Sequence, residues 1–200
     1  MAIISILASM ILPSLGKAKE KAITIHCVNN LRQLGLAMQM YADDYNERLP
    51  YTYPKATYAN GLPWNSTNPH PWLVVLADYY KNTNVVRCSA FSRVYNQSGY
   101  NYFINTRAAY VTAGKVPANV RLKLIDSPSF FILSGDCNWA FNQQDADPNN
   151  DDVDTLFQKP SPVHNNRVNI LFADWHIKTY KKFMGDEMSF SYYGAGTAYQ

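Results

Sequence analysis

The strongest constraint on this chain is a helical pattern that runs from its start to Asn46. Apolar residues in its second half recur at steps of three and four, which places them on one face of a helix. They are Ile23, Cys27, Leu31, Leu34, Met38, Tyr41 and Tyr45. Between Pro13 and Pro50 there is no other proline. We therefore predict one helix of about 40 residues, kinked near Pro13 and ending around Asn46.

The first fifteen residues carry no charge, and basic residues follow at once. A bilayer span takes about 20 apolar residues, so this run is short by about a turn and a half of helix. A secretory signal has a basic region before its apolar run, and none is present here. Either the segment lies shallowly in a membrane or the chain has lost its beginning. We expect residues 1–22 to form an apolar half of the helix that faces membrane or filament, and residues 23–200 to form a globular domain.

Beyond this helix the pattern changes to short elements separated by Gly, Pro and Asn. A short helix is predicted over Trp72–Tyr80. Strands are predicted at Val85–Arg87, Tyr100–Ile104, Leu122–Ile125, Phe130–Leu133, Val168–Ala173 and Ile177–Tyr180. The expected fold class is α+β, with the long N-terminal helix packed on a mostly antiparallel β-sheet.

Charge and cysteine content exclude several classes of function. The formal net charge of +3 lacks the basic excess of a nucleic-acid binder, so we expect no nucleic-acid partner. The three cysteines, Cys27, Cys88 and Cys137, contain no CxxC pair and allow at most one disulfide within the chain. No serine stands in a Gly-x-Ser-x-Gly elbow, and the adjacent His26 and Cys27 point about 100° apart on the helix. We therefore expect no enzymatic activity.

An acidic loop offers the one candidate cofactor site, for calcium. Oxygen ligands at alternate positions suit this ion. They are Asp145, Asp147, Asn149 and Asp151. The loop departs from an EF-hand because Asn150 replaces the glycine and Leu156 stands in place of the bidentate glutamate. A solvated acidic turn is the alternative.

His164 and Asp174 invite a metal or acid–base hypothesis. A strand over Val168–Ala173 would place the two side chains about 20 Å apart, so direct coordination is not expected. Each is better explained by turn or capping chemistry. The aromatic residues of the loop before Trp72 offer a platform on which a sugar can stack, although such residues more often fill cores or interfaces.

Two segments resemble a known family. The stretch from Ile6 to Pro50 resembles the N-terminal helix of prepilin-type pseudopilin-like proteins, the type II secretion pseudopilins and type IV pilins among them. The segment HNNRVNILFADWHIK is similar to the His-x9-Asp-Gly segment of that family, with His164 and Asp174 at the matching positions. The family's leader and the glutamate that directs filament assembly have no counterpart here. Trp175 replaces the family's glycine, so we expect the turn to be longer than two residues or of another type.

The resemblance implies a structural subunit of a pilin-like filament, anchored in the bacterial inner membrane with its domain in the periplasm or in an extracellular filament. Its expected partners are copies of itself through the N-terminal helix, other pilin-like subunits, and the secretion or pilus machinery. The alternative is a surface-exposed minor pilin or adhesin-like module that binds a glycan or another extracellular ligand. The family often has cysteines at the positions of Cys27 and Cys88, which implies a disulfide between them; two buried thiols are the alternative.

Overall fold

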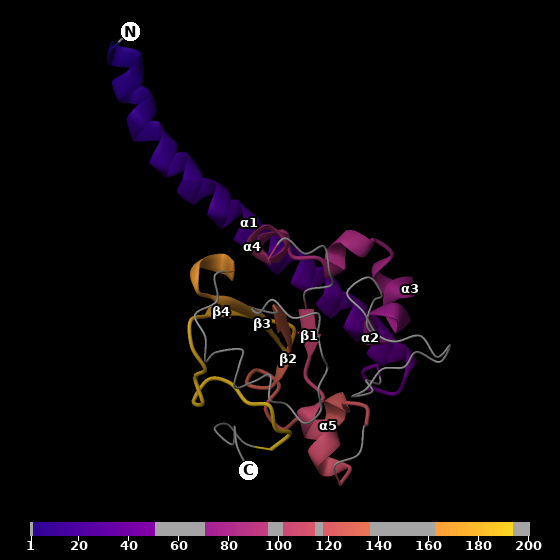
Figure 1. Cartoon of the computed structure of the whole chain (residues 1–200). Coiled ribbons are helices and arrows are strands. Elements are labelled where there is room, and N and C mark those ends of the chain that lie inside the picture. The colour runs from indigo at the N-terminus through magenta and orange to yellow at the C-terminus, as the bar shows by residue number, and fades with distance from the viewer. Residues whose placement is uncertain (1, 51–70, 96–101, 115–117, 137–162, 194–200) are drawn as a thin grey trace.

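The computed structural model describes residues 2–50, 71–95, 102–114, 118–136 and 163–193. One helix, α1 (Ala2–Asp44), extends far beyond the domain that packs on its C-terminal half (Figure 1). The elements that follow are short. They are α2 (Pro71–Val75), α3 (Ala77–Tyr80), η1 (Thr83–Val86), α4 (Ser89–Tyr95), β1 (Tyr102–Ile104), α5 (Arg107–Thr112), η2 (Leu122–Leu124), β2 (Ile132–Asp136), η3 (Val163–Asn165), β3 (Val168–Phe172) and β4 (Ile177–Tyr180). This is the predicted α+β arrangement.

Helix α1 confirms the prediction from apolar spacing. It is continuous through Pro13 and ends two residues before Asn46. The stripe from Cys27 to Tyr41 is buried against α3, η1, α4 and the sheet, whereas large apolar side chains at the other end are exposed to solvent. Among the helices of the described residues, none combines the length and mean hydropathy needed to cross a bilayer.

The sheet is antiparallel, with the order β1-β2-β3-β4. Strands β2 and β3 form its centre, and every residue in both is buried. Helix α1 approaches β3 closely at Gly35, where an added Cβ would lie 3.1 Å from a methyl carbon of Leu171. A glycine here lets the helix backbone rest on the sheet. The sheet therefore holds the second half of α1 in place.

Two predicted strands are wrong. The segment at Val85–Arg87 lies largely in the 3-10 helix η1, where Val85 and Val86 are both buried and the side chain of Asn82 accepts a hydrogen bond from the Asn84 amide. The segment at Leu122–Ile125 forms the 3-10 helix η2. In η1, Val85 and Val86 are buried consecutively where the chain turns under α1, whereas in η2 Leu122 and Leu124 are only partly buried. Short apolar runs of this kind do not distinguish a strand from a tight helical turn.

The other predicted elements are confirmed with shifted bounds. The strand expected at Phe130–Leu133 begins at Ile132 and continues to Asp136, and the helix expected at Trp72–Tyr80 is divided into α2 and α3. The β3–β4 hairpin has the longer turn that Trp175 requires. Four residues, 173–176, connect the strands, the Trp175 amide donates a hydrogen bond to the Phe172 carbonyl, and Trp175 adopts a φ of 70°. This left-handed position is the one that glycine favours.

Candidate functional site

Four polar side chains from distant parts of the chain meet beneath α1. Cys27 comes from α1, Cys88 from the connection between η1 and α4, Asp136 from the end of β2, and His164 from η3. The sulfur atoms of Cys27 and Cys88 lie 2.7 Å apart, and His164 Nε2 lies 3.3 Å from the Cys88 sulfur. The same nitrogen is 3.4 Å from Asp136 Oδ2. All four residues are buried, so the cluster is part of the domain's interior.

The orientation of His164 is set by Thr24 on α1. The Thr24 hydroxyl donates to the Glu20 carbonyl at 3.1 Å, so its oxygen accepts from His164 Nδ1 at 3.2 Å. With a proton on Nδ1, Nε2 faces Asp136 and Cys88. A bare nitrogen lone pair facing a carboxylate is repulsive, so Nε2 either shares a second proton or a cation with Asp136 or accepts a hydrogen bond from the Cys88 thiol. A shared proton makes the pair a buried imidazolium and carboxylate without net charge.

Asp136 is anchored by its neighbour on β3. Its Oδ2 accepts hydrogen bonds from the backbone amide and the side-chain amide of Asn169, at 3.0 and 2.6 Å. Burial raises the pKa of the Asp136 carboxyl to about 6, even though His164 and the Asn169 bonds act in the opposite direction. Burial also opposes the charge on His164, but Cys27 and the Asp136 carboxylate outweigh it and raise its pKa. Each partner therefore holds the other in place.

The cysteine pair has two chemical possibilities. As thiols, the residues share a hydrogen bond that lowers the pKa of Cys27 to about 4 and raises the pKa of Cys88. In that state Cys27, Cys88 and His164 offer three ligand atoms within 4.8 Å of one another, a set that suits a thiophilic metal. Loss of the two protons and two electrons would instead join the sulfurs in a disulfide. The expected burial of both cysteines is confirmed; the disulfide stays a prediction.

The remaining predicted site residues have different outcomes. Asp174 lies in the β3–β4 turn, where it accepts from the His176 amide at 3.2 Å and contacts His176 Nδ1 at 2.5 Å, as turn chemistry requires. For His164 the prediction of a turn is right for the backbone but wrong for the side chain, which is buried in the cluster. Trp72 is fully buried and offers no stacking surface. The calcium candidates, Asp145, Asp147, Asn149 and Asp151, lie outside the described residues, as do Cys137 and the loop before Trp72.

Sequence reasoning missed Asp136 as a functional residue. The available signal was that Asp136 follows the apolar and small residues Phe131–Gly135 directly, without a turn between them. A carboxylate at the end of a buried strand needs a partner, so this position could have been singled out. It also missed that His164 meets Cys27 and Cys88. The three residues come from separate elements that are far apart in the chain. Only the packing of η3 against α1 and α4 brings them together.

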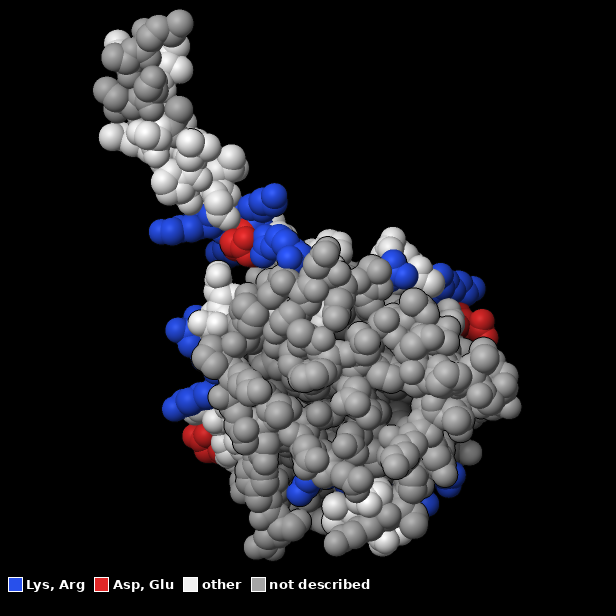
Figure 2. Space-filling view, in the orientation of Figure 1, with Lys and Arg blue, Asp and Glu red and all other residues white. Residues whose placement is uncertain are grey.

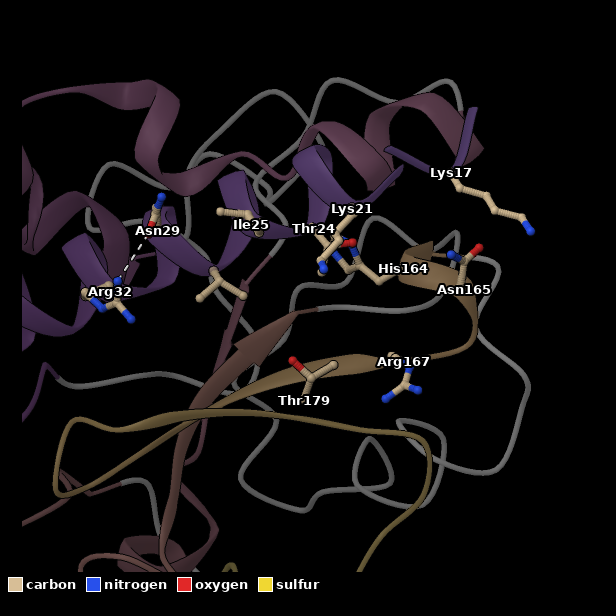
Figure 3. Close-up of a pocket in the computed structure, with 11 residues that line it drawn as sticks. Lys17, Lys21, Thr24, Ile25, Asn29, Arg32, His164, Asn165, Arg167 and Thr179 are labelled. Carbon is tan, nitrogen blue, oxygen red and sulfur yellow. Dashed lines mark hydrogen bonds between the residues drawn. The ribbon is translucent and has the colours of Figure 1, made fainter. Parts of the chain in front are cut away.

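A solvent-open pocket of about 620 Å³ adjoins this cluster between α1 and the β3–β4 side of the sheet. Figure 3 shows Lys21 and Thr24 on the helix above it, Thr179 on β4 and Arg167 just before β3 below, and His164 between them. Lys17 and Arg32 lie at its two ends (Figure 3). The pocket therefore combines basic side chains with hydroxyl and amide groups.

Comparison with known proteins gives one match. No curated protein and no solved structure matches the chain. The sequence profile of a family described as protein of unknown function, DUF1559, matches residues 16–119, which is more than half of the 200 residues. The matched region includes Cys27 and Cys88 and the domain-bound half of α1. The chain therefore belongs to the DUF1559 family.

Proposed function

We propose that this protein is a structural subunit of a pilin-like filament, of the type II secretion pseudopilin or type IV pilus class. The N-terminal half of α1 packs with the same helix of neighbouring copies and holds the subunit at the bacterial inner membrane. The domain lies on the periplasmic side or in an extracellular filament. The resemblance of residues 6–50 to pseudopilin helices and the membership of DUF1559 support this assignment.

The observation that carries the proposal is the exposed apolar end of α1. Six large apolar side chains there each expose at least 60% of their surface. They are Ile3, Ile4, Met10, Ile11, Leu12 and Leu15. Monomeric proteins rarely leave a continuous apolar surface of this kind in water. Burying six such side chains contributes on the order of 10 kcal/mol, which is enough to drive association with other helices or lipid.

The proposal is tested by the assembly state of the full chain after detergent removal. Sedimentation velocity and electron microscopy should show large assemblies for the parent protein, and Ile4→Glu together with Ile11→Glu should abolish them. The matched control is Leu36→Glu, because Leu36 is also an exposed apolar residue of α1 but lies where the helix packs on the domain. A parent chain that is monomeric without detergent, or assemblies that survive the Ile4 and Ile11 changes, would refute the proposal.

A further inference from the structure

The pocket between α1 and the sheet has a strongly one-sided charge. Lys17, Lys21, Arg32 and Arg167 line it, and among the residues that the structure describes no aspartate or glutamate does. Within the described residues, none of these four has a carboxylate oxygen within 4.0 Å. The carboxylate nearest in sequence, Glu20, pairs with Arg93 instead, at 2.7 Å. The pocket thus gathers positive charge that no carboxylate of the described residues pairs with directly.

The wall formed by η3 carries backbone strain. His164, Asn165 and Asn166 have φ values of 51°, 55° and 60°, three consecutive left-handed residues without a glycine. A left-handed conformation is unfavourable for residues that carry a Cβ, although asparagine tolerates it better than most. The contacts of His164 with Thr24, Cys88 and Asp136 hold this conformation. It places Asn165 on the pocket wall, where its amide can hydrogen-bond to a ligand.

The pocket lies beside the apolar end of α1. Lys17 and Lys21 follow the exposed Leu15 within two turns of helix, and Figure 2 shows basic side chains gathered where the helix leaves the domain. The lining also includes Ile25 and Val28, so apolar surface lies next to the cations. A ligand that fits has an anionic group, hydrogen-bond acceptors and an apolar portion that continues toward the end of α1.

We propose that this pocket binds the phosphate-bearing headgroup of an anionic phospholipid. Lys21 and Arg167 hold the phosphate from opposite walls, the Asn165 side-chain amide donates a hydrogen bond to a headgroup oxygen, and the glycerol end lies toward Lys17 and the apolar end of α1. The inference rests on the proposed function only in that the apolar end of α1 must lie against a bilayer. Each basic residue near the surface of an anionic membrane raises the affinity of the protein for that membrane about fivefold.

The test is a vesicle partition assay with the full chain. Vesicles of phosphatidylcholine alone are compared with vesicles that contain phosphatidylglycerol, at one fixed ionic strength. Partition into neutral vesicles reports on the apolar end of α1, and the additional partition into anionic vesicles reports on the pocket. Failure of the proposed function and failure of this inference are therefore distinguishable.

Lys19 supplies the matched control. It lies on α1 two residues from Lys21, which is about 3 Å along the axis, and it does not line the pocket. Lys21→Gln and Arg167→Gln should each reduce the anionic increment by more than the roughly fivefold that diffuse attraction gives, and together by more than about thirtyfold, whereas Lys19→Gln should reduce it by about fivefold at most. None of the three should change partition into neutral vesicles.

Two results would overturn the proposal. If Lys19→Gln and Lys21→Gln have equal effects and Arg167→Gln has none, the attraction is diffuse and no pocket is involved. If inorganic phosphate or glycerol phosphate at matched ionic strength saturates the pocket in calorimetry while anionic vesicles bind no better than neutral ones, the site takes a soluble anion rather than a lipid.

Discussion

Reduction of the Cys27–Cys88 pair is the perturbation that tests the interior of this site most directly. The two residues are 61 positions apart, and their sulfur atoms lie 2.7 Å from each other in the core. A disulfide here closes a loop that restricts the unfolded chain. The chain-entropy relation gives about 4 kcal/mol of stabilisation for a loop of this length. In a chain of this size that corresponds to a fall of roughly 8–16 °C in Tm on reduction.

The assay compares urea and thermal unfolding of the full chain with and without a phosphine reductant, in one detergent throughout. The parent and Cys137→Ser should both lose about 4 kcal/mol on reduction. Cys27→Ala and Cys88→Ala should be less stable than the parent and should show no effect of the reductant. This loss of response is the informative readout, because the packing defect of an alanine would not produce it.

Thiol counting completes the test. Protein exported to the periplasm of an expression host, isolated without reductant and then denatured, should contain one titratable thiol, that of Cys137. Three thiols, together with equal unfolding midpoints in both conditions, would refute the disulfide. Three thiols with one equivalent of bound metal would instead identify Cys27, Cys88 and His164 as metal ligands.

Three further predictions concern the residues that shape the site and the sheet. Folding raises the pKa of Asp136 from an ordinary value of 3.8 to about 6, so protonation of this carboxyl favours the folded state. The free energy of unfolding should therefore fall as the pH rises from about 4 to 6. Asp136→Asn should flatten that fall in urea midpoints, and an unchanged slope would contradict the assignment. Trp175→Gly should be about 1 kcal/mol more stable than Trp175→Ala in urea unfolding, because both lose the ring but only glycine relieves the φ of 70°; equal stabilities would count against strain. Gly135→Ala should lower the free energy of unfolding by about 3 kcal/mol, because its Cβ would lie 2.7 Å from the Asn169 carbonyl oxygen. Gly35→Ala should lower it by less than about 1 kcal/mol, because its Cβ would face a methyl group of Leu171 that can move. Thermal melts that rank the two variants in the reverse order would be inconsistent with this packing.

The sequence alone was sufficient for the long helix and the last hairpin. Steps of three and four predict both the helix and the face that is buried, because one periodicity specifies both. The buried part of that face runs from Cys27 to Tyr41, whereas Ile23 is partly buried and Tyr45 is exposed. The strands β3 and β4 were predicted within one residue because apolar runs on both sides of a turn sequence are a local signal. Asp174 and Trp175 acted as their local chemistry predicts, since a turn depends on neighbours in the chain.

The tertiary structure decided whatever depended on distant partners. Val85–Arg87 is apolar enough for a strand, yet the chain has to turn beneath α1 at that point and forms a 3-10 helix instead. The cluster of Cys27, Cys88, Asp136 and His164 has no spacing that sequence can identify, because its members come from four separate elements. A buried carboxylate or imidazole is stable only beside a partner, and the partner is chosen by packing in space rather than by separation along the chain.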